Sequence, residues 1–140
     1  MKPSEAAQDV IHEMQMQVVV DTGGRVSLPA VLSYTPADPH AVTATFKTGE
    51  GEITWVFARE LLRDGMRDIA GNGDIIIRPG HPDRGAQVIL TLNSPSGSAV
   101  IEGSRHQIAA FMSEVYEMVP EGAEWVYLDI DGAIENMLEA

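Results

Sequence analysis

The sequence predicts an α+β domain built on antiparallel β-sheet layers, with seven to eight strands and flanking helices. Three observations support this prediction. Apolar and polar residues alternate in a series of short stretches, as they do in half-buried strands. Turn sequences rich in glycine and proline separate these stretches. The strand patterns are grouped and are not interleaved one by one with helices, which favours an antiparallel sheet. A chain of 140 residues fits one domain.

The first part of the chain predicts an N-terminal extension followed by four strands. Residues 1–13 form the extension, with a short helix or a frayed lead-in over Ser4–Glu13, and residues 14–140 form a single domain. Pro29 lies inside the second strand pattern and has no amide hydrogen to donate, so that strand is expected at an edge or with a bulge. The four strand patterns are Met14–Val18, Arg25–Tyr34, Ala41–Phe46 and Ile53–Phe57.

After Ala58 helical and extended patterns both occur. The sequence RELLRDGM predicts a helix of about two turns that starts at Arg59, with Gly65 as its stop signal. The sequence AGNG is typical of a turn. Further strands are predicted at Asp74–Pro79, Gln87–Asn93 and Ala99–Glu102.

A longer helix follows the last of these strands. Ser104 and Gln107 form a capping box, and Pro120 marks the end of the helix. Apolar residues at helical spacing form one stripe: Ile108, Phe111, Met112, Val115, Met118 and Val119. The residues from Trp125 to Leu128 predict an extended apolar segment, and Asp131 is suited to cap a last short helix.

Composition excludes several classes of protein. The chain carries 21 acidic and 9 basic residues, a net charge of −12, and no two basic residues are adjacent. Binding to nucleic acid or to an anionic membrane surface depends on clustered positive charge, so neither is expected. There is no cysteine, no apolar run of the ~20 residues that span a bilayer, and no signal-peptide pattern. We expect a soluble, cytoplasmic protein.

No residue pattern predicts catalysis, a metal site or a cofactor. The four histidines are too far apart in sequence to form a helical metal pair, and the glycine-rich turns match no phosphate-binding loop. Trp55 and Trp125 could stack on bases, but an isolated tryptophan among apolar residues is more often part of a core. We therefore expect a binding protein that is not an enzyme and that has no cofactor.

The stretch from Val31 to Phe46, VLSYTPADPHAVTATF, contains a corner stiffened by Pro36 and Pro39. Two interpretations remain open. The corner either sets only the angle between two strands, or it also presents a surface to a partner. A rigid corner suits recognition because it loses little conformational entropy on binding.

Five segments resemble, in order, the successive signatures of the SsgA-like proteins, which regulate sporulation and cell division in filamentous actinobacteria. The segments are LSYTPADPHAVTATF, WVFARELLRDGM, GDIIIRP, LTLNSPSGSAVIEG and VPEGAEWVYLDID. The resemblance covers the chain from about Met14 to its C-terminus. It implies a non-enzymatic adaptor that helps to position FtsZ, the tubulin-like division protein, at future septa and promotes its assembly together with SsgA.

The resemblance also implies an architecture and a binding surface. The family fold is similar to a trimeric, Whirly-like single-strand-binding scaffold, which makes a single-stranded nucleic-acid binder the alternative function; the net charge opposes it. The chain is expected in the cytoplasm, concentrated at septa, without inserting into the membrane. The residues expected to contact FtsZ or SsgA-like partners are Tyr34, Asp38, Pro39, His40, Arg59, Glu60 and Arg63.

Overall fold

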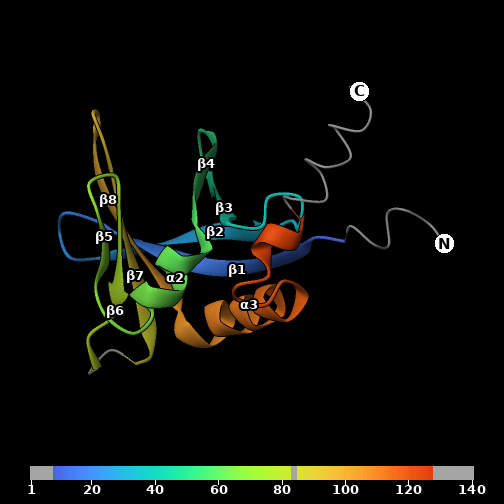
Figure 1. The fold of residues 1–140 in the computed structure, drawn as a ribbon. Coiled ribbons are helices and arrows are strands. Elements are labelled where there is room, and N and C mark those ends of the chain that lie inside the picture. The colour runs from blue at the N-terminus through green and yellow to red at the C-terminus, as the bar shows by residue number, and fades with distance from the viewer. Residues whose placement is uncertain (1–7, 83–84, 128–140) are drawn as a thin grey trace.

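In the part of the chain that the structure describes, eight antiparallel strands form one continuous, curled sheet (Figure 1). The computed structural model describes residues 8–82 and 85–127. Along the sheet the strands lie in the order β4-β3-β2-β1-β8-β7-β6-β5. The predicted α+β fold with an antiparallel sheet is confirmed. The strands are β1 (Val10–Val19), β2 (Arg25–Tyr34), β3 (Ala41–Thr48), β4 (Gly51–Ala58), β5 (Ala70–Asn72), β6 (Ile75–Pro79), β7 (Gln87–Ser94) and β8 (Gly97–Ser104).

The sheet consists of two four-stranded halves joined by a short ladder. β1 pairs with β2 along ten residues, from Val10 to Val19, but with β8 only over Gln17–Val19. Because the central ladder is short, the halves diverge on either side of it, and the β3–β4 and β7–β8 hairpins stand apart (Figure 1). Helix α3 (Arg105–Met118) packs against β1, β7 and β8, so it covers the junction between the halves.

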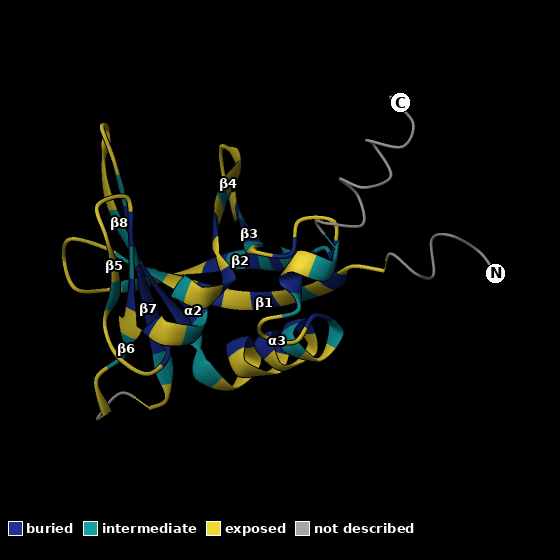
Figure 2. Ribbon diagram, viewed as in Figure 1, coloured by how far each residue is buried: buried dark blue, intermediate teal, exposed yellow. Residues whose placement is uncertain are grey.

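The core lies between the sheet and α3. On the strands, alternate side chains are buried, as the period of two predicts, and the exposed residues lie mainly on the opposite face and at the hairpin tips (Figure 2). The α3 stripe buries Ile108, Phe111, Met112 and Val115, and the Ser104 hydroxyl accepts a hydrogen bond from the Gln107 amide, as the capping box predicts. No helix among the described residues is long and apolar enough to cross a bilayer.

Several strand predictions need correction. β1 begins at Val10, so residues 10–13 are extended and not helical. β2 is an interior strand, not an edge strand, and Pro29 is accommodated because pairing with β3 begins one residue later, at Ala30. The predicted turn AGNG contains the short strand β5, Ala70–Asn72.

The C-terminal predictions have a mixed outcome. The structure describes residues 124–127 of the C-terminal segment that was expected to be extended, and they are helical. The last helix, expected to begin at Asp131, lies outside the described residues, as do residues 4–7 of the short helix or frayed lead-in predicted over Ser4–Glu13.

Helix α2 (Arg59–Gly65) ends where it was predicted to end, but for a different reason. Gly65 has no positive φ, and the residue after it, Met66, is also right-handed. A Cβ on Gly65 would lie 2.5 Å from Ile77 Cβ and 2.9 Å from the Ile77 carbonyl oxygen. The glycine is therefore required because it lets α2 approach β6 closely.

Replacing Gly65 by alanine should lower the free energy of unfolding by about 1–3 kcal/mol, because the added methyl group overpacks the contact between α2 and β6. Urea denaturation measures this change. Gly49→Ala is the matched control, since its Cβ would have no neighbour within 4 Å and should change stability by less than about 0.5 kcal/mol. Equal stability of the two variants would contradict this account of Gly65.

Candidate partner-binding surface

The corner between β2 and β3 is a folded turn, held by its own hydrogen bonds. The Asp38 amide donates to the Thr35 carbonyl at 3.0 Å, and the Tyr34 hydroxyl donates to the Pro39 carbonyl at 2.9 Å. Tyr34 and Pro39 are buried, whereas Asp38 and His40 are exposed. The corner thus has a buried side that fixes its shape and a polar side that faces solvent.

The corner also caps helix α2. Ala58 precedes the helix in an extended conformation and offers no side-chain cap. The amide of Arg59 instead donates to the His40 carbonyl at 2.8 Å. This bond satisfies one of the amide groups that the first turn of a helix leaves without an intrahelical partner. The two sequence signatures that were expected to share a surface are therefore joined directly.

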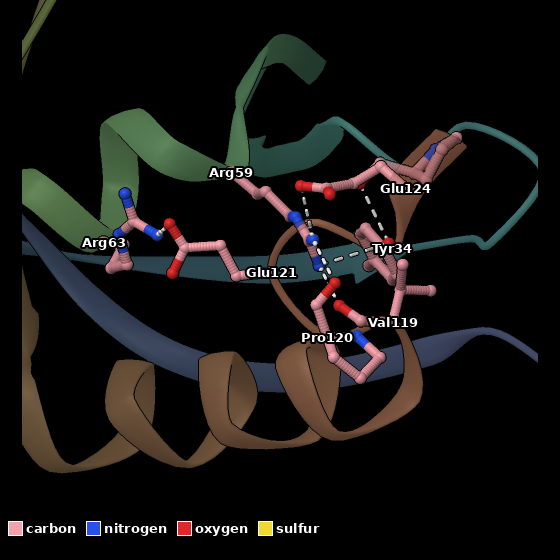
Figure 3. A network of polar contacts seen from close by, with 8 residues as sticks. Tyr34, Arg59, Arg63, Val119, Pro120, Glu121 and Glu124 are labelled. Atoms are coloured by element: carbon pink, nitrogen blue, oxygen red, sulfur yellow. Dashed lines mark hydrogen bonds and ion pairs between the residues drawn. The ribbon is translucent and has the colours of Figure 1, made fainter. Parts of the chain in front are cut away.

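The guanidinium group of Arg59 is fully buried and links three parts of the chain (Figure 3). Nη1 donates to the Val119 carbonyl at 2.6 Å, and Nη2 pairs with Glu124 Oε2 at 2.9 Å. The guanidinium carbon lies 4.1 Å from the centre of the Tyr116 ring, a favourable cation–π distance. Arg59 therefore supports the surface from below and does not face a partner.

Hydrogen bonding and burial shift the pKa values of two groups in this network. The hydrogen bond from Arg59 is the main cause that holds the pKa of Glu124 below its usual value, so this carboxylate stays ionised although only 6% of the residue is exposed. Burial raises the pKa of Tyr34 to about 12, which keeps its hydroxyl neutral and able to donate to Pro39.

Arg63 lies one turn further along α2 and makes a second connection to the segment after α3. Its Nη1 pairs with Glu121 Oε1 at 2.9 Å (Figure 3). Its Nε donates a hydrogen bond to Asp64 Oδ1 at 3.2 Å. The hydrogen bond to Glu121 is the main reason that the pKa of Arg63 is raised. Glu60, the remaining predicted residue on α2, is exposed.

Sequence reasoning missed the acidic partners and misplaced one tryptophan. No sequence motif indicates that Glu121 and Glu124 pair with the arginines of α2, and buried glutamates are rare. Trp125 is 61% exposed, so the expectation of a core residue is wrong for it, whereas Trp55 is partly buried against the core. Within residues 8–82 and 85–127 no group of histidine, aspartate or glutamate side chains is arranged to hold a metal ion.

Comparison with known proteins gives one family. A family model described as "Streptomyces sporulation and cell division protein, SsgA" matches residues 28–124. The chain is 41% identical over 127 residues to the sporulation-specific cell division protein SsgB of Frankia casuarinae, an alignment that covers 90% of this chain and 89% of the relative. It is 35% identical over 127 residues to SsgB of Streptomyces coelicolor, covering 90% and 93% of the two chains.

Solved structures agree with this result. An SsgA-like sporulation-specific cell division protein from Thermobifida fusca superposes with a TM-score of 0.87 at 34% identity, covering 98% of this chain and 99% of that one. A structure from work on SsgB mutations that correlate with longitudinal cell division during sporulation of Streptomyces coelicolor gives a TM-score of 0.82 at 35% identity, covering 87% and 97%.

Replacing Glu124 by leucine should lower the free energy of unfolding at pH 7 by about 3–5 kcal/mol, because it leaves the buried Arg59 charge without its carboxylate. Glu121→Leu is the matched control: it removes an ion pair of the same 2.9 Å length in the same segment, but an exposed one. That change should be about 0–1 kcal/mol. Urea denaturation of both variants checks the contrast, and similar losses would contradict it.

The contribution of Glu124 to stability should depend on pH. Its pKa is lower in the folded protein than the ordinary 4.5, so the unfolded chain binds the proton more readily. The contribution is therefore complete above pH 4.5 and is lost as the pH falls through the lower, folded-state pKa. The difference in unfolding free energy between the natural chain and Glu124→Leu should be constant from pH 7 to pH 5 and should shrink at lower pH.

Proposed function

Because the chain belongs to the SsgA family of sporulation and cell-division proteins, we propose that it acts in cell division as a non-enzymatic adaptor that recruits FtsZ to septum sites. It promotes FtsZ assembly during sporulation-specific septation. The observation that supports this role best is the backbone hydrogen bond from the Arg59 amide to the His40 carbonyl. This bond joins the corner and α2 into one surface.

Within this proposal the predicted residues divide into two groups. Asp38, His40 and Glu60 are exposed and contact the partner. Tyr34, Pro39 and Arg59 are buried and hold those three side chains in place, and Arg63 fixes α2 to the segment after α3. A surface fixed in this way loses little conformational entropy when a partner binds.

The proposal extends to further partners, assembly and location. SsgA-like proteins are further partners, the chain assembles as a trimer, and it is concentrated at division septa. Its acidic surface, with a net charge of −12, disfavours phosphate binding and so supports a protein partner over a nucleic acid.

Co-sedimentation and light scattering with FtsZ from the same organism test the proposal. The protein should pellet with FtsZ polymer and increase its assembly. The double variant Asp38→Ala/His40→Ala should bind FtsZ about ten-fold more weakly, a loss typical of removing interface side chains. Its melting temperature should stay within about 2 °C of the natural chain, because both side chains are exposed.

His106→Ala/Glu117→Ala provides the control for this experiment. It removes the same pair of chemical groups, one imidazole and one carboxylate, from exposed positions on α3. This variant should bind FtsZ as the natural chain does. If the natural chain neither pellets with FtsZ polymer nor increases FtsZ assembly, the adaptor role is wrong. If the two double variants bind FtsZ with equal affinity, the corner is only a scaffold.

A further inference from the structure

The two edges of the curled sheet differ in length and protection. β5 has three residues and β4 has eight. Among the described residues no strand pairs with the outer side of β4. Natural proteins usually protect such an edge with lysine, proline, a bulge or a covering element. β4 contains no lysine and no proline, and its ladder with β3 runs without a bulge from Ala58 to Gly51.

The pairing with β3 shows which backbone groups of β4 are free. The amide of Arg59 donates to the His40 carbonyl, and this pair continues the register of β3 and β4. Hydrogen-bonded and non-hydrogen-bonded pairs alternate along an antiparallel ladder. Counting from His40 and Arg59, residues 57, 55 and 53 bond to β3. The amide and carbonyl groups of Glu52, Thr54 and Val56 therefore point away from β3, toward the open edge.

Two side chains of β4 extend from this edge into an uncharged groove. Ile53, which is 50% exposed, and Trp55 line a groove of about 540 Å³ between the β3–β4 and β7–β8 hairpins. Phe46, Leu92, Ser96 and Ile101 line the same groove. Charged residues make up 21% of the chain, yet no charged side chain among the described residues lines this groove.

We propose that the β4 edge and this groove form a second docking surface, which binds an extended segment of a partner protein as an added strand. The segment hydrogen-bonds to Glu52, Thr54 and Val56 and places alternate apolar side chains beside Ile53 and Trp55. This mode of recognition combines backbone bonds with side-chain pockets of period two. It goes beyond the proposed FtsZ contact, because the corner lies at the opposite end of the β3–β4 hairpin.

Charge indicates the chemistry of the partner. Glu50 and Glu52 lie at the tip of the hairpin, beside the open edge, and the whole chain carries −12. Opposite charges on directly paired strands attract each other. The occupant is therefore a segment of a different protein that carries lysine or arginine next to its alternating apolar residues.

Peptide selection provides a defined probe. Random 12-residue peptides displayed on phage are selected on the immobilised full-length protein, and the enriched sequences are synthesised with a fluorescent label. The enriched sequences should show apolar residues at every second position and at least one basic residue. On peptide binding, hydrogen exchange should slow at least about ten-fold at the amides of Glu52, Thr54 and Val56, which become hydrogen-bonded.

Three variants and one modified peptide locate the site. Ile53→Gln should weaken binding about ten-fold, whereas Val56→Gln, a similarly exposed residue whose side chain lies on the opposite face, should not. Thr54→Pro removes one outward amide without breaking the β3 ladder and should also weaken binding. The same peptide with N-methylated backbone amides should not bind, because it cannot form the added ladder.

Other outcomes would overturn the proposal. Failure to enrich any peptide, or equal affinity for Ile53→Gln and Val56→Gln, shows that this groove is not a docking site. Protection of Glu52, Thr54 and Val56 amides in the free protein, rising with protein concentration and lost in Ile53→Gln, shows that a second copy occupies the edge. Analytical ultracentrifugation of the same samples identifies that case. These results are independent of whether the corner binds FtsZ.

Discussion

The buried guanidinium group of Arg59 is the interaction on which the corner, helix α2 and the segment after α3 depend. A charge removed from water requires both a counter-ion and hydrogen-bond acceptors. Glu124 supplies the counter-ion, and the carbonyl groups of Val119 and Pro120 supply acceptors at 2.6 and 3.5 Å. A lysine in place of Arg59 could not bond to all of these partners, because a planar group with several fixed donors is needed to reach a carboxylate and two carbonyls at once.

The same network explains why the candidate surface is rigid although it consists of a turn and a two-turn helix. The contacts of Arg59 reach back to Tyr34 and forward to Glu124, so they join residues that are far apart in sequence. Such contacts form only when both the sheet and α3 are in place. The exposed side chains of Asp38, His40 and Glu60 are thus positioned by the whole fold and not by the local sequence.

The sheet was predictable because its period of two survives in nearly every strand, and α3 because its apolar stripe and its Ser104 cap are both strong signals. β5 was not, since three residues that include Gly71 show no alternation and are recognisable only beside β6. The corner and α2 were predictable as elements, but the burial of Arg59 was not, because arginine is rarely buried without a partner and Glu124 gives no sequence signal. Gly65 was assigned correctly to the helix end, while its contact with Ile77 depends on tertiary packing.

The two ends of the β3–β4 hairpin have opposite properties, and this contrast suits an adaptor. At the corner, backbone groups are satisfied internally and polar side chains face outward, so recognition there depends on side-chain chemistry and tolerates little change of shape. Along β4, the backbone groups of Glu52, Thr54 and Val56 lack partners among the described residues, and no charged side chain among those residues lines the nearby groove, so an extended segment can supply both bonds and apolar contacts. A partner at the corner and a partner on the β4 edge would therefore be held in a fixed relative position by the single ladder of β3 and β4, without a hinge between them.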